Sequence, residues 1–271
     1  MISSLFSYTY MRNAFLAAVM TSIVCGIIGT IIVEKRLVMM SGGIAHTSFG
    51  GIGMGYFLGI EPIIGALIFS IIAAFSIAGI RRRTNTNSDS LIGMFWAIGM
   101  ALGIMFIAFT PGYPPDMTSY LFGDILTVSN FSIKLMGIVD VIVVITIVSL
   151  FNYWKAYLFD DQFTKVLGIP TLFLENFLFI LIALTIVVLI KVVGIILVIA
   201  LLTIPPAIAK FFTYNLKKKI LLSIGVGMIL SVLGLFISYQ FNIASGATII
   251  LLNGAAYFTV LILNRFKSTK H

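Results

Sequence analysis

The sequence predicts an all-α membrane protein whose helices cross the bilayer many times. Of its 271 residues, 60% are hydrophobic and only 10% are charged, and the mean hydropathy is +1.15. Apolar runs of about 20 residues, the length that an α-helix needs to cross the hydrocarbon core, recur along the chain. We therefore expect a single transmembrane domain over residues 1–271. It should have about nine spans, or about eight if the first lies partly along the membrane surface.

Charged, polar or proline-containing segments separate the spans. The predicted spans cover residues 14–33, 37–62, 63–81, 91–109, 133–150, 172–190, 192–212, 220–239 and 246–263. Two connections are longer than the others. Residues 110–131 contain three prolines, which favour a loop with a short surface helix. Residues 155–171 form the longest polar interruption of the chain.

The lysine and arginine residues predict the orientation of these spans. With a cytoplasmic C-terminus, all 17 of them except Arg12, Lys134 and Lys191 fall on the cytoplasmic side. The positive-inside rule therefore favours an N-out, C-in topology, with loop 110–131 outside and loop 155–171 in the cytoplasm. The same rule accounts for the net charge of +8, so we expect the lipid bilayer, and no nucleic acid, as the partner of this basic chain.

The span at residues 37–62 is rich in glycine and carries His46, one of only two histidines. Small residues four positions apart form a ridge that lets another helix approach closely, and here they are Gly51, Gly55 and Gly59. A second face presents Gly42 and His46 at the same spacing. Because an imidazole is costly to place in lipid, we expect His46 to face a gap between helices, where it meets protein, water or a ligand.

The segment FDDQFTKVLGIP, residues 159–170, predicts a short amphipathic helix inside loop 155–171. Its apolar side chains are Phe159, Phe163, Val166 and Leu167, and Gly168 is the expected helix stop. Such a helix can rest on another protein. The alternative is a connector that lies flat on the membrane, and the residues alone leave both interpretations open.

Two prolines lie deep in the span at residues 192–212. Pro205 and Pro206 remove two backbone donors, so we expect the helix to kink there. The carbonyl groups left free should be satisfied by Thr203 or by water. A kink of this kind either lines a transport pathway or serves helix packing alone.

Asp140 falls near the middle of the span at residues 133–150. An ionisable residue at this depth is by default a candidate for a functional site. A structural role is the alternative, with Asn253 or Lys191 as the partner of its carboxylate. Lys191 itself lies between two apolar runs, which is typical of a side chain that extends to the membrane interface.

Enzyme activity has little support in the residues. The sequence contains no GxxxxGK[ST] phosphate loop, so we do not expect the chain to hydrolyse ATP in the P-loop manner. An intramembrane hydrolase that uses Ser41 or Ser48 with His46 is a remote alternative. It would need an activated nucleophile, and no recognised nucleophile motif is present.

Five stretches, in this order and at these separations, resemble a known family. They are EKRLVMMSGGIAHTSFGGIGMGYFLG, MTSYLFGDILTVS, FDDQFTKVLGIP, KVVGIILVIALLTIPPAIAK and SGATIILL. Over nearly its whole length the chain resembles the membrane permease subunit of metal-type ABC importers, which bring zinc, manganese or iron into bacteria and archaea. The resemblance implies a multi-pass cell-membrane protein that imports zinc or manganese, with iron less favoured, by alternating access. A permease for a metal chelate, such as a siderophore, haem or cobalamin, is the alternative.

The resemblance also implies partners. Permeases of the family work as dimers with two separate ATPases and an external metal-binding protein, so loop 110–131 is expected to form part of the outer docking face. Loop 155–171 corresponds to the family's coupling helix, which docks into a groove of the ATPase. That role would fall on Asp160, Asp161, Gln162, Phe163 and Gly168. No cofactor is expected on this chain, and Zn²⁺ or Mn²⁺ is expected as its substrate.

At the metal pathway the chain departs from the family pattern. The second span of the family commonly carries an Asp and a His four residues apart, which can share one divalent ion. The His is present as His46, but Gly42 occupies the Asp position. Either transit binding is loose, which suits an ion that must also leave, or Asp140 or Asp124 completes the site. The kink at Pro205 and Pro206 is expected to shape the wall of this path.

Overall fold

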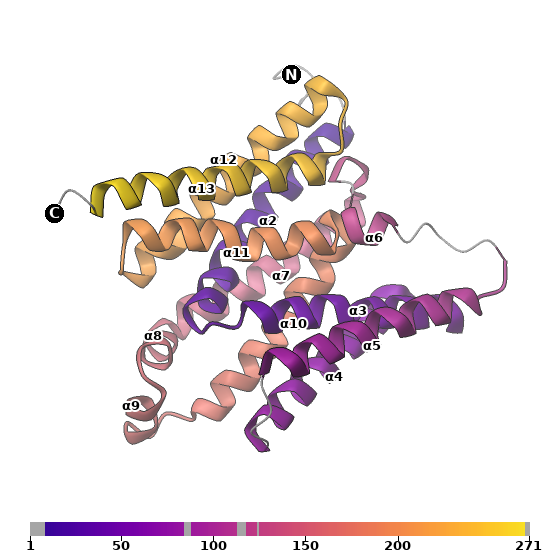
Figure 1. Ribbon diagram of the computed structural model, residues 1–271. Coiled ribbons are helices and arrows are strands. Elements are labelled where there is room, and N and C mark those ends of the chain that lie inside the picture. The colour runs from indigo at the N-terminus through magenta and orange to yellow at the C-terminus, as the bar shows by residue number, and fades with distance from the viewer. Residues whose placement is uncertain (1–8, 84–87, 113–117, 124, 269–271) are drawn as a thin grey trace.

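The computed structural model describes residues 9–83, 88–112, 118–123 and 125–268, and these residues form helices and connecting turns without any strand (Figure 1). The helices are α2 (Thr9–Glu34), α3 (Val38–Leu58), α4 (Pro62–Arg83), α5 (Ser88–Ala108), α6 (Thr118–Phe122), the 3₁₀ helix η1 (Ile125–Thr127), α7 (Asn130–Ser149), α8 (Phe151–Phe159), α9 (Asp161–Val166), α10 (Thr171–Val193), α11 (Ile195–Phe212), α12 (Leu216–Phe241) and α13 (Ser245–Ser268). The all-α, polytopic architecture predicted from composition is confirmed.

Among the described residues, eight helices are long and apolar enough to cross a membrane: α2, α4, α5, α7, α10, α11, α12 and α13. The first segment, α2, is one of them with 26 residues. The long helix outside this set is α3, because its 21 residues include glycines, hydroxyl side chains and His46. The number of crossings and the N-out, C-in orientation stay predictions.

Helix α3 is enclosed by its neighbours. It packs along most of its length against α4 and α5, and the three helices lie side by side in Figure 1. A Cβ atom on Gly51 would overlap the backbone carbonyl of Gly65 in α4, and a Cβ atom on Gly55 would lie 2.7 Å from the Cα atom of Pro62. Gly59 has a different role, since it ends α3 with a φ of +69°. Glycine thus allows the backbones of α3 and α4 to touch.

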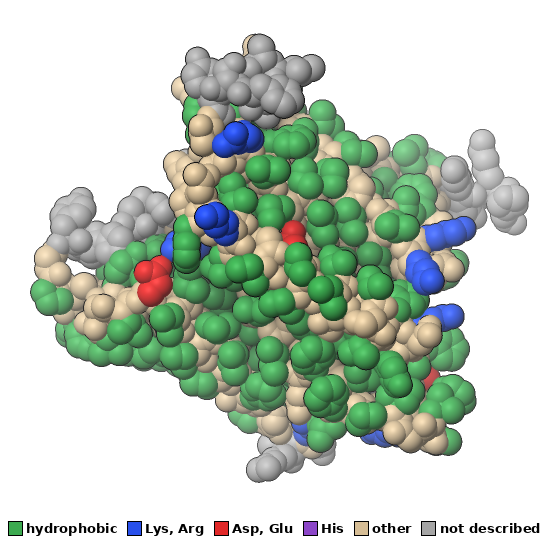
Figure 2. Space-filling view, turned by 180° about the vertical axis from the view of Figure 1, so that it is seen from behind, with side chains coloured by type: hydrophobic (Ala, Val, Ile, Leu, Met, Phe, Trp, Pro, Cys, Tyr) green, Lys and Arg blue, Asp and Glu red, His purple; other side chains and the backbone are tan. Residues whose placement is uncertain are grey.

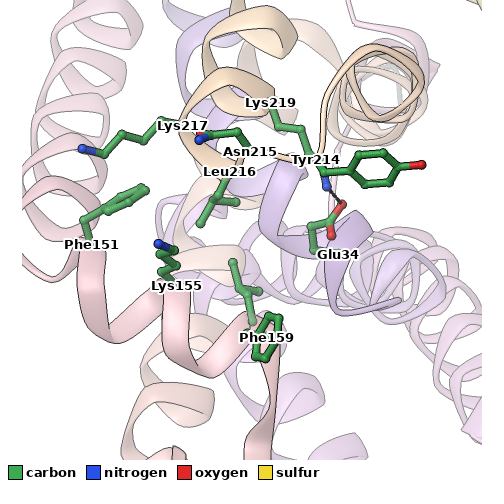
Figure 3. A pocket seen from close by; sticks show the side chains of 10 residues that line it. Glu34, Phe151, Lys155, Phe159, Tyr214, Asn215, Leu216, Lys217 and Lys219 are labelled. Carbon is green, nitrogen blue, oxygen red and sulfur yellow. Dashed lines mark hydrogen bonds and ion pairs between the residues drawn. The ribbon is translucent and has the colours of Figure 1, made fainter.

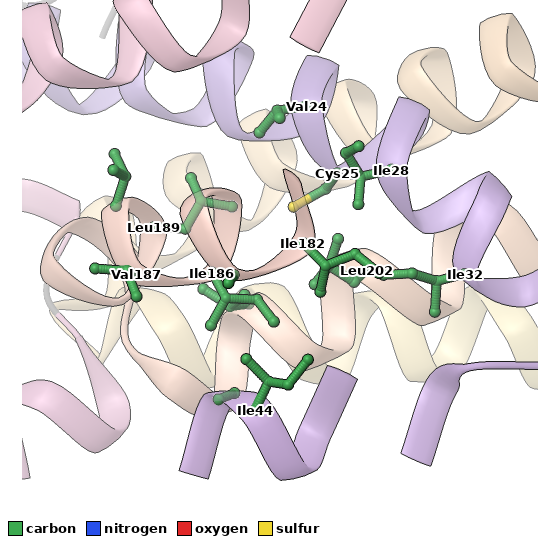
Figure 4. Packing of buried hydrophobic residues seen from close by; sticks show 14 of the residues in the cluster. Val24, Cys25, Ile28, Ile32, Ile44, Ile182, Ile186, Val187, Leu189 and Leu202 are labelled. Carbon is green, nitrogen blue, oxygen red and sulfur yellow. The ribbon is translucent and has the colours of Figure 1, made fainter. Parts of the chain in front are cut away.

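The centre of the bundle is a layer of aliphatic side chains between α2, α10, α11 and α3 (Figure 4). Ile28 of α2, Ile44 of α3, Ile186 of α10 and Leu202 of α11 are all fully buried within it. Large apolar side chains also cover the outside, and Figure 2 shows one face on which they dominate, with basic side chains gathered toward its edges. An apolar exterior of this kind is what contact with lipid requires.

Helix α11 continues through both of its prolines. The Thr203 hydroxyl donates to the carbonyl oxygens of Ile199, at 2.8 Å, and Ala200, at 3.2 Å. It does not reach the carbonyl of Leu202, which lies four residues before the second proline and lacks its usual donor. A Cβ atom on Gly29 of α2 would overlap this carbonyl oxygen. The backbone of α2 therefore packs directly against the part of α11 that the prolines alter.

Candidate functional site

His46 lies in the middle of α3 with only 8% of its surface exposed. Its ring is stacked on the indole of Trp96 from α5, with 3.7 Å between ring centroids and 10° between planes. Within the described part of the chain, the Nδ1 atom of His46 has no hydrogen-bond partner. A buried imidazole with an unused ring nitrogen is suited to bind a transition metal ion through that nitrogen.

The space one helical turn before His46 is open. A Cβ atom built on Gly42 would meet no heavy atom of its neighbours within 4 Å, whereas one on the adjacent Gly43 would lie 2.6 Å from the Ile92 side chain. The position where the resemblance implies a carboxylate therefore has room for a side chain. In this protein the position carries none, and His46 is the candidate ligand that α3 itself offers.

The serines beside His46 are engaged elsewhere. The Ser41 hydroxyl donates to the carbonyl oxygen of Val38 at 2.8 Å, and the Ser48 hydroxyl donates to that of Ala45 at 2.6 Å. Both hydroxyl groups thus bond to the backbone of their own helix, so neither hands its proton to His46. This geometry gives no support to a serine–histidine dyad.

Asp140 lies in α7, which packs against α2 and α10, and 8% of its surface is exposed. Neither of the two groups considered as its structural partner bonds to Asp140 in the described part of the chain. Lys191 pairs with Glu61, with 3.0 Å between Nζ and Oε1, and the Asn253 amide nitrogen donates to the Ile249 carbonyl at 2.8 Å, while its amide oxygen has no partner among the described residues.

The candidate metal ligands do not form a cluster within this chain. In the described residues, no three His, Cys, Asp or Glu side chains lie close enough to hold a metal ion together. His46 and Asp140 belong to α3 and α7, and Asp124 falls outside the described residues. The roles of all three stay predictions, and His46 is the one with an observed unpaired donor atom.

The predicted amphipathic helix of loop 155–171 forms as α9, separated from α8 at Asp160. The Asp160 carboxylate accepts from the backbone N–H groups of Gln162, at 2.7 Å, and Phe163, at 3.1 Å, and so caps α9. Gly168 follows the helix with a φ of +74°, which glycine adopts without strain. The side chain of Asp161 lies outside the described residues.

The apolar side of this segment faces outward. Phe159 is 87% exposed, Phe163 55% and Val166 84%. Side chains of this kind are seldom left so open on a lone helix unless something covers them, which here is either a partner protein or the membrane surface. The segment therefore has the form of a docking element, and the partner that covers it is not identified by its geometry.

A pair of tyrosines joins α3 to α6, at the end of the protein opposite to α9. The hydroxyl oxygens of Tyr56 and Tyr120 are 2.6 Å apart. Burial, and then this hydrogen bond, raises the pKa of the Tyr120 phenol well above its usual value. The ion pair between Lys191 of α10 and Glu61, which follows α3, lies at the same end of α3. These contacts tie α6 and α10 to α3.

Sequence reasoning missed Trp96, Tyr56 and Tyr120. Trp96 is one of only two tryptophans in the chain and lies in a predicted span, which was the one available signal. Its contact with His46 depends on α3 and α5 packing backbone to backbone, as at Gly99, where a Cβ atom would lie 2.5 Å from the Cα atom of Thr47. Such an approach is a tertiary property that local sequence does not reveal.

Comparisons with known proteins agree over almost the full chain. The model of the ABC 3 transport family matches residues 7–264. An uncharacterised membrane protein of Synechocystis sp. is 42% identical over 95% of this chain and 92% of its own length. The manganese transport system membrane protein MntC of Listeria monocytogenes is 34% identical over 96% of this chain and 93% of its own length. Among solved structures, PsaBC from Streptococcus pneumoniae in complex with a Fab is 31% identical, with a TM-score of 0.90 over 100% of this chain and 98% of that one.

Proposed function

Since the chain belongs to the ABC 3 transport family, we propose that it is the permease of an importer that moves Mn²⁺ or Zn²⁺ into the cell. Its resemblance to metal-type ABC permeases is confirmed by the family match and by the manganese transport relative. The observation that carries the proposal for this chain is the buried imidazole of His46, whose Nδ1 atom has no partner among the described residues. We propose that this nitrogen binds the ion transiently on its way through.

A single protein ligand fits the task of transit. An ion on a conduction path must be bound well enough to enter and weakly enough to leave. The open space at Gly42 beside His46 leaves room for water molecules that remain on the ion. Mn²⁺ and Zn²⁺ both accept an imidazole together with oxygen ligands, so this chain favours neither strongly. The name of the Listeria relative, a manganese transport system membrane protein, supports manganese as the first ion to test.

Energy for transport would come from separate subunits. We propose that two copies of the chain work with two cytoplasmic ATPases, which bind the segment α9 through its exposed Phe163 and Val166. Asp160 and Gly168 would fix the start and the end of this docking helix. An external metal-binding protein would deliver the ion to the face that contains loop 110–131.

We propose alternating access as the mechanism. Closure of the ATPases on ATP would move α8 and α9, and through α7 and α10 the movement would reach the helices around His46. The tyrosine contact between α3 and α6 is placed to close the outer end when the path opens inward. Pro206, packed against Gly29 of α2, and Pro205, packed against Gly227 of α12, would allow α11 to bend during this change.

Uptake by proteoliposomes tests the proposal. The chain is reconstituted with its ATPase and its binding protein, with ATP inside, and is offered radioactive manganese, radioactive zinc or a labelled metal chelate. Saturable, ATP-dependent uptake of manganese or zinc is the expected result. Uptake of the chelate without any bare ion, from a complex that hydrolyses ATP, would contradict the proposal in favour of a chelate importer.

A further inference from the structure

A pocket of about 400 Å³ opens where α2 ends and where α8 and α12 begin (Figure 3). Three lysines line it, Lys155 from α8 and Lys217 and Lys219 from α12, together with Glu34 from α2. Phe151 and Phe159, at the two ends of α8, add aromatic surface. We call this the basic pocket, and it belongs to the end of the molecule that carries α9.

The charges of the basic pocket are unbalanced. Lys219 is only 5% exposed, and its Nζ atom lies 2.7 Å from Oε1 of Glu34. Lys210 approaches the same oxygen at 3.8 Å, so the one carboxylate of the pocket is already shared by two ammonium groups. The ammonium groups of Lys155 and Lys217 have no acidic partner among the described residues. Lys217 lies over the Phe151 ring, 5.0 Å from its centroid. Two cationic groups are thus left for an anion from outside the chain.

The start of α12 adds to the attraction for an anion. Asn215 caps this helix by accepting from the backbone N–H group of Lys218, at 3.3 Å. The N–H groups of the first turn and the dipole of a 26-residue helix favour negative charge at this end. The lysines and the helix end therefore act on the same space, and Figure 3 shows the Lys155 side chain extending up toward Leu216.

The basic pocket lies at the end of an apolar surface. In the last turn of α7, Val148 is exposed, and one turn into α12, Leu221 is exposed. Both helices pack on α2 and are candidate membrane spans. The pocket is therefore at the level where a span meets water, which is also where Phe159 and the exposed Tyr214 are expected to lie. Basic pockets between helices at the cytoplasmic side of a membrane are suited to lipid phosphates.

We propose that the basic pocket binds the phosphodiester headgroup of an anionic phospholipid. Lys155 and Lys217 contact the phosphate, and the acyl chains lie along the exposed faces of α7 and α12. Of the exposed apolar side chains of the docking segment, Phe159 at the end of α8 lines the pocket, whereas Phe163 and Val166 of α9 do not, so those two stay available to an ATPase. The lipid holds α8 against the start of α12 and thereby fixes the position of α9. This inference does not depend on which ion the permease carries.

Lipid retention by the purified permease–ATPase complex tests this inference. The complex is equilibrated in detergent with ³²P-labelled phosphatidylglycerol, and the lipid that stays bound per permease is counted. Each lysine near an anionic surface is worth roughly fivefold in affinity, so the double variant Lys155→Ala/Lys217→Ala should bind roughly 25-fold more weakly. The variant Lys155→Arg/Lys217→Arg keeps both charges and should retain the lipid. Lys218→Ala is the matched control, because Lys218 is an exposed neighbour that does not line the pocket.

Further measurements distinguish a lipid headgroup from inorganic phosphate or a protein partner as the group that the lysines bind. Inorganic ³²P-phosphate, added to lipid-free complex at millimolar concentration, should bind no more to wild type than to the double alanine variant. Equal lipid retention by wild type and that variant would overturn the proposal. So would lysine-dependent binding of inorganic phosphate without lipid retention. Loss of the ATPase subunit from the double variant, with lipid retention unchanged, would instead assign the lysines to a protein partner and overturn it as well.

Discussion

The imidazole of His46 lies flat against the indole of Trp96, with 3.7 Å between the ring centroids. The stack covers one face of the imidazole and leaves its edges free, and the nitrogen atoms that can bind an ion lie on those edges. Trp96 is 37% exposed, so part of its side chain stays uncovered within this chain. In the proposed function, the indole therefore sets the orientation in which His46 would meet an ion.

Replacement of Trp96 should weaken ion capture without unfolding the protein. An aromatic contact of this kind is worth about 1 kcal/mol, which predicts roughly a fivefold higher KM for uptake by Trp96→Ala. Trp96→Phe should restore most of the loss, because a phenyl ring can still stack on the imidazole. Uptake as a function of metal concentration gives the KM. An unchanged KM in Trp96→Ala would show that the stack has no part in ion binding.

A carboxylate at position 42 should turn loose binding into tight binding. Gly42→Asp places an oxygen ligand one turn from His46, in space that is open in this structure. The KM for manganese should fall, and the maximal rate should fall as well, since an ion that is held more tightly leaves more slowly. Initial uptake rates over a range of concentrations measure both. A Gly42→Asp variant that folds and transports with unchanged KM would contradict the proposal that the ion passes beside residue 42.

Two glycines of α3 should respond to alanine with opposite signs. Gly51→Ala forces the backbones of α3 and α4 apart and should destabilise the protein by about 1–3 kcal/mol. Gly42→Ala meets open space and should stabilise it by up to about 1 kcal/mol, because alanine is the better helix former. Thermal unfolding of the detergent-solubilised chain compares the two. Equal melting temperatures of the two variants would contradict the close approach of Gly51 in α3 to Gly65 in α4.

Asp160 should matter for the coupling between metal transport and ATP hydrolysis. Asp160→Ala removes the cap of α9 and should destabilise this short helix by about 1 kcal/mol, while the spans stay folded. Asp160→Asn is the matched control, since asparagine caps helices about as well. We expect metal-stimulated ATP hydrolysis by the reconstituted complex to fall in the alanine variant and to persist in the asparagine variant. The same loss in both variants would point to the charge of Asp160, and no loss in either would remove α9 from the coupling path.

Local features of the fold were predictable from the sequence. The long apolar runs gave helices because a membrane span must satisfy its own backbone hydrogen bonds, and Phe163 and Gly168 marked the apolar side and the end of α9. The cap that Asp160 provides at the start of α9 was not predicted. The sequence-based prediction left open whether the first segment lies partly along the surface, which would leave eight spans instead of nine. That segment, α2, has the length and hydropathy of a span, and the long helix outside the set of eight is α3.

Contacts between distant helices were not predictable. Lys191 and Glu61 are 130 positions apart, and nothing near either of them in the sequence indicates that they pair. The stack of His46 on Trp96 and the bond between Tyr56 and Tyr120 likewise depend on which helices lie next to each other. Residue type and spacing identified His46 as unusual, while its orientation came from tertiary packing.

Transport by a His46→Ala variant tests the central claim most directly. The permease is reconstituted with its ATPase and binding protein, and uptake of radioactive manganese and zinc is measured beside that of His271→Ala, which removes the other histidine of the chain. We predict that the complex with His46→Ala assembles and hydrolyses ATP through its ATPase subunits but loses most of its uptake, while the complex with His271→Ala transports as wild type does. Normal uptake of both ions by an intact His46→Ala complex would contradict the assignment of His46 to the path of the ion.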